Sequence, residues 1–462
     1  MNEGNTSGMA AAPADAEPAG RDSPWLLATL YFLQNAAMGS WMVTMATYLK
    51  ANTAPLGEQI FAPGFVGVAY GCGPWGALVA PFITGVIADR WLRADRVTSV
   101  LSGLSAVALA AAGAAKSQTG FHVALLLHCI FFMPTNSLVA TMTLRRLADP
   151  QRQFPLIRAC GTLGWIAAGI AVGWGGVLAT GASIELTNAP FYVGAFALGV
   201  LALSCLLMQP PPRRSGARSS FRLSEAMELV RRGGIGRLLL IGLIVSIAPQ
   251  FYAIYANVYL NALGMSYSAA RLTLGQLTEI FCMVSLPILL RYSSPHRLIL
   301  CGLTVWAARY FLLSYSGTEG AMVGIHLAIL MHGFSFTLIG IPLQLEVHRV
   351  APDCYRATAQ GLLVIATQGI GAMAGARLAG LAEQRLISGG EADAASIRAF
   401  AGNWPQFWML PALGALAALI AAYWLGRDIE RFERHANVTP ETNATPAPFD
   451  RGGTALQGGE AE

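Results

Sequence analysis

A carboxylate and an amide lie one helical turn apart inside a long apolar stretch of this chain. Glu279 and Gln276 fall within residues 267–291, and most of their neighbours are apolar. A charge near the centre of a bilayer costs about 3 kcal/mol on insertion scales, so it needs a partner or a task. An apolar environment favours the neutral form of a carboxyl group. Glu279 is therefore suited to carry a proton across a membrane; the structural alternative is an ion pair with Arg158 or Arg309.

A second set of polar side chains follows one face of an expected helix. Arg158, Thr162 and Trp165 stand at positions i, i+4 and i+7, which form one stripe on a helix. Pro155 falls in the first turn, where a helix tolerates proline. The spacing predicts that the three side chains share one face of the helix, and Arg158 could also serve as a positive anchor near the helix end.

Three further candidates with polar or aromatic side chains stand in apolar stretches. They are Gln250, His332 and Phe336. An aromatic ring can stack on a flat ligand, and desolvated polar groups discriminate strongly between related ligands. For each residue a structural role stays open: a bridge between helices for Gln250, an ordinary hydrogen bond for His332, and core or lipid packing for Phe336.

These residues must be held by membrane-spanning helices. The chain of 462 residues is 54% hydrophobic and 12% charged, whereas soluble domains are about a quarter charged. A bilayer core of about 30 Å needs roughly 20 apolar residues of helix, and the ten-residue alternation of a membrane barrel is missing. The sequence predicts an all-α membrane protein with twelve transmembrane helices at 25–48, 61–88, 97–115, 120–144, 155–179, 189–208, 238–262, 267–291, 297–315, 320–346, 356–386 and 403–425.

Arginines gather in alternate loops and set the expected topology. They follow the second, fourth, sixth, eighth, tenth and twelfth predicted spans. By the positive-inside rule both termini are cytoplasmic, and the net charge of +5 reflects topology rather than nucleic-acid binding. We expect a multi-pass protein of the cytoplasmic (inner) membrane that contacts lipid, binds no nucleic acid and is a monomer.

The longest internal polar segment divides the spans six and six. The predicted organisation is a disordered cytoplasmic tail at 1–24, a six-helix bundle at 25–208, a cytoplasmic linker at 209–237, a second six-helix bundle at 238–426 and a disordered tail at 427–462. This arrangement resembles the major facilitator fold, in which two halves rock around a site at the midplane.

A loop motif at the end of the second span supports that resemblance. Residues 85–93 read G-V-I-A-D-R-W-L-R and resemble the G-x-x-x-D-R-x-G-R gate of the same superfamily, with Leu92 in place of the second glycine. The resemblance implies that Gly85, Asp89, Arg90 and Arg93 close the cytoplasmic side in one state. A chance D-R pair in a basic loop is the alternative.

Several short motifs, in a shared order from about residue 30 to 425, resemble the bacterial nucleoside:proton symporter family. They are Phe32-Leu33-Gln34, Gly39-Ser40-Trp41, Met133-Pro134-Thr135, residues 154–158, Gly161-Thr162-Leu163-Gly164, residues 276–279, Arg309 and residues 356–361. The resemblance implies import of nucleosides with protons, and it places Arg158, Thr162, Gln250 and Phe336 on the substrate cavity.

The chain departs from the family pattern at several of these positions. His332 stands where the family usually has Tyr, Thr337 where an acidic residue is expected, Ala253 in place of an amide and Trp165 in place of Phe. A proton-coupled sugar or oligosaccharide symporter on the same scaffold therefore stays open. Arg309 is expected to support packing between the halves.

Other charges inside the predicted spans lie toward their ends. Glu346, Arg377 and Glu383 are expected to reach the interface by snorkelling.

Enzymatic chemistry is not indicated. The chain has no H-E-x-x-H, G-x-S-x-G or Gly-rich phosphate loop. Its seven cysteines include no C-x-x-C pair. We expect no metal, no cofactor and no catalytic residue.

Overall fold

The structure is a computed structural model, and it describes residues 23–53, 60–89, 93–147, 150–175, 177–178, 181, 183–209, 229–231, 233–319, 322–352, 355–387 and 403–438. Arg90, most of the predicted linker and most of both predicted tails lie outside the described residues. Within these ranges the structure is helical, with one isolated bridge between Thr53 and Phe61.

The first group of helices precedes residue 209. It comprises α1 (Pro24–Met42), α2 (Met45–Ala51), α3 (Phe65–Tyr70), α4 (Cys72–Asp89), α5 (Ala94–Ala114), α6 (Gln118–Arg146), α7 (Pro150–Ile170), η1 (Ala171–Gly175) and α9 (Ala189–Leu206). Local signals set some of these boundaries. The Ser23 hydroxyl caps α1 by accepting a hydrogen bond from the Trp25 N–H, and Pro24 occupies the first helical position.

The second group follows residue 232. It comprises α11 (Gly233–Val245), α12 (Pro249–Ala262), α13 (Ser268–Tyr292), α14 (Pro295–Glu319), α15 (Met322–Val350), α16 (Arg356–Val364), η3 (Ile365–Gly371), α17 (Ala372–Leu386) and α18 (Trp404–Val438). The break between α11 and α12 falls immediately before Pro249, whose missing N–H and ring oppose a continuous helix.

Ten helical segments in the described part of the chain are long and apolar enough to cross a membrane. The protein is therefore a multi-pass α-helical membrane protein, as the composition predicts. The last helix departs from the prediction, because α18 continues to Val438 and residues 427–438 were expected to belong to a disordered tail.

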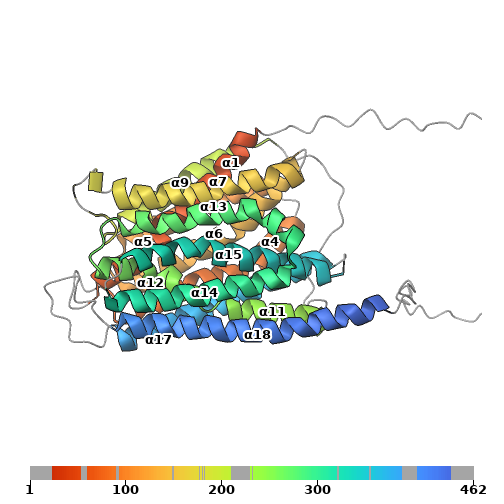
Figure 1. The fold of residues 1–462 in the computed structure, drawn as a ribbon. Coiled ribbons are helices and arrows are strands. Elements are labelled where there is room, and N and C mark those ends of the chain that lie inside the picture. Colours follow the sequence, from red (N-terminus) through yellow and green to blue (C-terminus); the bar gives the residue numbers. More distant parts are fainter. Residues whose placement is uncertain are drawn as a thin grey trace, which may run out of the picture.

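The two groups repeat one packing pattern. In the first group α1 packs on α7 and α9, α4 on α6, and α5 on α6 and α9; in the second, α11 packs on η3 and α18, α13 on α15, and α14 on α15 and α18. In Figure 1, α1, α7 and α9 lie along one side of the molecule and the blue helices α17 and α18 along the opposite side. Between the groups, α7 meets α13, α2 meets α12, and α3 meets α17.

Candidate functional site

A close crossing of α13 and α15 fixes the position of the central carboxylate. A Cβ on Gly333 of α15 would overlap the backbone nitrogen of Glu279, and a Cβ on Gly275 would lie 2.9 Å from the Cβ of His332. The Thr278 hydroxyl joins the helices as well, because it accepts from the Gly333 N–H at 3.2 Å and can donate to the Leu330 carbonyl at 2.8 Å. Small residues allow this approach, and Glu279 is held partly exposed beside α15.

We expect Gly333→Ala to destabilise the protein by about 3 kcal/mol or more. The new methyl group would overlap backbone atoms of Thr278 and Glu279, which cannot move aside as a flexible side chain can. Gly340→Ala on the same helix is the matched control, since a Cβ there meets nothing within 4 Å. Thermal unfolding followed by a thiol-reactive dye measures both variants. Equal melting temperatures for the two would contradict the crossing.

A second glycine crossing presents the stripe on α7. A Cβ on Gly164 would overlap the Phe32 carbonyl of α1, and one on Gly161 would lie 2.6 Å from the Asn35 amide nitrogen. The Trp165 ring covers Gly39 of α1 at 3.0 Å from its hypothetical Cβ. Thr162 and Trp165 are half-buried on this helix.

Arg158 is the charged member of the stripe on α7. It is exposed, and its charge interacts with Tyr31 of α1 and, across the interface between the groups, with Glu279. Because α7 packs on α13, the charges of Arg158 and Glu279 lie close enough to interact across the interface between the groups.

His332 and Phe336 belong to an aromatic stack that includes a residue not expected from the sequence. The His332 ring lies 5.4 Å from the Tyr252 ring of α12 at an interplanar angle of 21°, and 5.7 Å from the Phe336 ring at 27°. Phe336 is 50% exposed, so one face of its ring is available. The stack connects α12 to α15, the helix that crosses α13 at Gly275 and Glu279.

The two glutamines behave differently. Gln276 is partly buried beside Glu279 on α13, and its side-chain oxygen is buried without a hydrogen-bond partner. Gln250, in the first turn of α12, packs its Cγ at 2.6 Å from the hypothetical Cβ of Gly375 on α17. This contact shows Gln250 packed between α12 and α17, close to the break before Pro249.

Arg309 corrects one expectation from the sequence. It packs within the second group, against Tyr252, Tyr310, Ala328 and His332, and not between the two groups. The sequence predicts how deep Arg309 lies along its helix, but it does not predict which neighbouring helices the arginine contacts.

One end of the interface between the groups is closed by a cluster around Glu185, hereafter the Glu185 cluster. Glu185 is 1% exposed and lies in the loop before α9. Its carboxylate accepts from the Ala269 N–H at the start of α13 at 3.1 Å, from Asn257 Nδ2 at 3.0 Å and from Asn261 Nδ2 at 3.3 Å. Three donors satisfy this buried charge, and a carboxylate is favourable at a helix N-terminus.

A buried ion pair closes the same end. Lys50 of α2 pairs with Glu383 of α17, with side chains 7% and 1% exposed, and the Thr47 hydroxyl donates to Asn257 of α12. The expected snorkelling of Glu383 is therefore wrong, because a lysine from the first group neutralises it inside the protein. Glu346 is buried too, and it pairs with the more exposed Arg349 at 2.7 Å.

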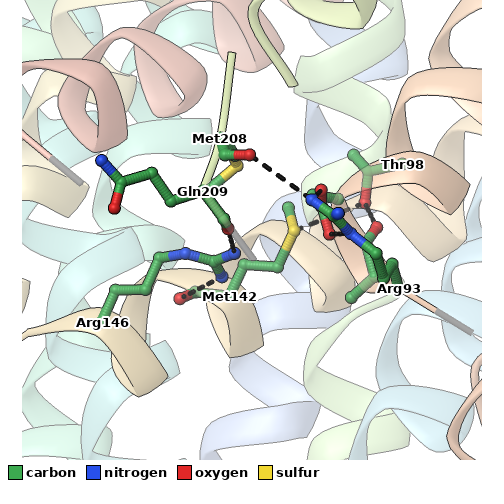
Figure 2. Close-up of polar contacts among 8 residues, drawn as sticks. Arg93, Thr98, Met142, Arg146, Met208 and Gln209 are labelled. Atoms are coloured by element: carbon green, nitrogen blue, oxygen red, sulfur yellow. Dashed lines mark hydrogen bonds and ion pairs between the residues drawn. The ribbon is translucent and has the colours of Figure 1, made fainter. Parts of the chain in front are cut away.

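The predicted gate lies at the C-terminal end of α4. Gly85 and Asp89 belong to the last turns of α4, and Arg90 lies outside the described residues. Arg93 precedes α5, donates to Asp95 at 2.7 Å and reaches the Met208 carbonyl at 3.5 Å. Figure 2 shows Arg93 and Arg146 directed at the carbonyls of Met208 and Gln209, just beyond the end of α9. These contacts stay within the first group.

Sequence reasoning missed Tyr252, the Glu185 cluster and the pairing of Lys50 with Glu383. Glu185, a carboxylate in a loop on the side poor in arginine, gave no signal of burial. Lys50 at a span end and Glu383 at another offered opposite charges at similar depth, which was the one usable clue. Among the described residues no group of three or more His, Cys, Asp or Glu side chains is arranged to hold a metal ion.

Ten helices of membrane-spanning length and a buried ion pair that joins the two groups are features of a membrane transporter. The family model described as nucleoside H+ symporter matches residues 24–427. The chain belongs to the nucleoside H+ symporter family, as its motifs indicated.

Relatives and solved structures agree with this family. The chain is 28% identical over 404 residues to "Putative nucleoside transporter YegT" of Escherichia coli, covering 86% of this chain and 92% of that protein. It is 26% identical to xanthosine permease of the same organism, covering 89% and 98%. A crystal structure of nucleoside transporter NupG superposes with a TM-score of 0.75 at 21% identity, covering 87% and 98%, which establishes the fold.

The fold is shared by transporters of other substrates. A D-xylose-proton symporter superposes with a TM-score of 0.63 at 15% identity, covering 86% of this chain and 95% of that one. The fold therefore does not separate sugars from nucleosides, whereas the family match over residues 24–427 favours nucleosides over the sugar alternative.

Proposed function

We propose that this nucleoside symporter works by alternating access with Glu279 as the proton carrier. The observation that carries the proposal is the place of Glu279 on α13, where α13 meets α7 of the first group and the Arg158 charge acts on it from across the interface. A protonated Glu279 no longer attracts Arg158, and an ionised one does. Proton binding therefore changes the attraction between the two groups, which is what coupling a proton to a conformational change requires.

We propose further that the chain crosses the inner membrane twelve times as two bundles of six helices, with both termini cytoplasmic. The repeated packing order of the two groups supports the two bundles, and the arginine-rich loops support the orientation. In this orientation the Glu185 cluster and the Lys50–Glu383 pair face the outside, and the described conformation is closed on that side. Gly85, Asp89, Arg90 and Arg93 form the opposite gate, which closes when the cytoplasmic ends approach.

The nucleoside site that we propose lies between the stripe on α7 and the stack on α15. The base lies on the exposed ring of Phe336, while Gln276, Gln250 and His332 offer hydrogen bonds to the base edge and the ribose. The unsatisfied side-chain oxygen of Gln276 supports this assignment, because a buried acceptor without a partner is costly unless a ligand completes it. Arg158, Thr162 and Trp165 complete the cavity from the first group.

We expect Phe336→Ala to weaken nucleoside binding by about 5- to 150-fold, the range that corresponds to the loss of one base stack. Phe334→Ala is the matched control, because Phe334 is also exposed on α15 but packs edge-on against Phe281 of α13. Titration calorimetry of the purified protein with uridine measures both variants. An equal loss in the two would show that Phe336 acts through general packing.

Uptake into proteoliposomes tests the function itself. Radiolabelled uridine, adenosine and xanthosine are offered with and without an inward proton gradient, and unlabelled lactose and melibiose are offered as competitors. We expect concentrative uptake of at least one nucleoside only with the gradient and no competition by the sugars. Equal uptake with and without the gradient would contradict coupling to protons. Competition by lactose or melibiose would favour a sugar as the substrate.

A further inference from the structure

A buried arginine in the second group has an unusual set of neighbours. Arg309 on α14 is 0% exposed, and no carboxylate among the described residues pairs with it. Its Nε donates to the Ala328 carbonyl at 2.8 Å, and its guanidinium lies 3.5 Å above the centre of the Tyr252 ring. A charge inside a membrane protein is costly and usually marks a task.

The remaining contact of Arg309 determines the protonation of a residue in the proposed site. Its Nη1 lies 3.2 Å from Nδ1 of His332. A guanidinium carries donors and no acceptor, so Nδ1 of His332 must accept this hydrogen bond. The ring proton of the neutral imidazole then resides on Nε2, and a doubly protonated ring would direct an N–H at the arginine cation.

The His332 ring is also prevented from turning. It is stacked between Tyr252 and Phe336, and its Cβ lies close to Gly275 of α13. Within the described part of the chain its Nε2 has no protein partner, and the neighbouring Phe336 ring is half exposed. The charged or titratable groups in contact with His332 are Arg309 from α14 and Tyr252 from α12.

We propose that Arg309 is a positioning residue that fixes His332 as a hydrogen-bond donor, through Nε2–H, to an acceptor atom on the edge of the nucleobase. This inference rests on the proposed nucleoside site. It assigns two separate tasks: Glu279 changes protonation during transport, whereas His332 keeps one protonation state and reads the base. A ring nitrogen or carbonyl oxygen of the base is the acceptor chemistry that His332 recognises.

Base analogues that each lack one acceptor test the donor directly. Dissociation constants of the full-length protein are measured for adenosine and its 1-, 3- and 7-deaza analogues, which lack one ring nitrogen acceptor each, and for uridine and its 2-thio and 4-thio analogues, in which a weakly accepting sulfur replaces one carbonyl oxygen. Two variants are compared with the parent: His332→Phe keeps the stack and has no donor, and His332→Gln keeps an N–H donor of similar reach.

We expect one analogue to bind the parent protein about 2- to 10-fold more weakly than its nucleoside, which is the usual worth of one hydrogen bond. The difference should persist in His332→Gln and vanish in His332→Phe. The same difference in His332→Phe, or no discrimination by the parent, would overturn the inference. Failure of the parent to bind any nucleoside would instead refute the proposed function.

The role of Arg309 is tested by nitrogen NMR of ¹⁵N-histidine-labelled protein, with the His332 signals identified by their absence from His332→Gln. We expect the Nε2–H form at every pH between about 5.5 and 8. In Arg309→Met the hydrogen bond that holds Nδ1 as an acceptor is lost, so the Nδ1–H form should appear beside the Nε2–H form, and the discrimination against the acceptor-deficient analogue should shrink. An Nδ1–H or doubly protonated ring in the parent protein would overturn the proposal even if Arg309→Met does not fold.

Discussion

Glu279→Gln is expected to abolish accumulation of nucleoside driven by a proton gradient while leaving nucleoside binding measurable. Glutamine keeps the size of the side chain and its acceptor oxygen but can neither take up nor release a proton. It also removes the charge that attracts Arg158 across the contact between α7 and α13. Proteoliposome uptake under an imposed gradient measures the loss, and exchange of labelled for unlabelled nucleoside without a gradient measures the retained binding and movement.

A second carboxylate provides the control for this variant. Glu346 on α15 is buried and pairs with Arg349, whose side chain is 54% exposed. Glutamine at this position removes a buried charge and leaves the largely exposed Arg349 in contact with water, so Glu346→Gln should retain accumulation. Full accumulation by Glu279→Gln, or equal losses in both variants, would contradict the proposal that Glu279 carries the coupled proton.

Lys50→Met is expected to shift the protein away from the conformation described here. It removes the lysine charge that faces the buried Glu383 carboxylate, and breaking a buried ion pair from one side costs about 3–5 kcal/mol. Because the pair joins α2 to α17 across the two groups, the cost falls on the conformation closed at this end. The population of that conformation should drop by more than 100-fold relative to the one open at this end.

Spin labels at Lys116 and Ser266, exposed residues in the turns before α6 and α13, report this change as a longer distance in a background without native cysteines. The double variant Lys50→Met/Glu383→Leu is the control, since it removes both charges and should restore much of the closed population. An unchanged distance distribution in Lys50→Met would show that the pair does not hold this end shut.

The sequence predicts the helices of the fold well because apolar length is a local property. The spacing of Gln276 and Glu279, and of Arg158, Thr162 and Trp165, likewise follows from helical periodicity. The family motif Gly161-Thr162-Leu163-Gly164 also has a clear physical reason, since Gly161 and Gly164 allow the contact of α7 with α1.

Contacts between distant segments could not be predicted in this way. Lys50 and Glu383 are 333 positions apart, and only the packing of α2 and α3 against α12 and α17 brings them together. The same applies to Arg309 and Tyr252, whose side chains meet because α12, α14 and α15 converge. The sequence therefore predicts an interfacial position for Glu346 and Glu383, whereas the structure shows both side chains buried.

The most direct test of the central claim is the movement of protons with the nucleoside. Proteoliposomes containing the protein and the pH dye pyranine are exposed to nucleoside added outside, without a preset gradient. Acidification of the lumen is expected with the parent protein and with Glu346→Gln, and no acidification with Glu279→Gln. Acidification of equal size with Glu279→Gln would contradict the assignment of the proton to this carboxylate.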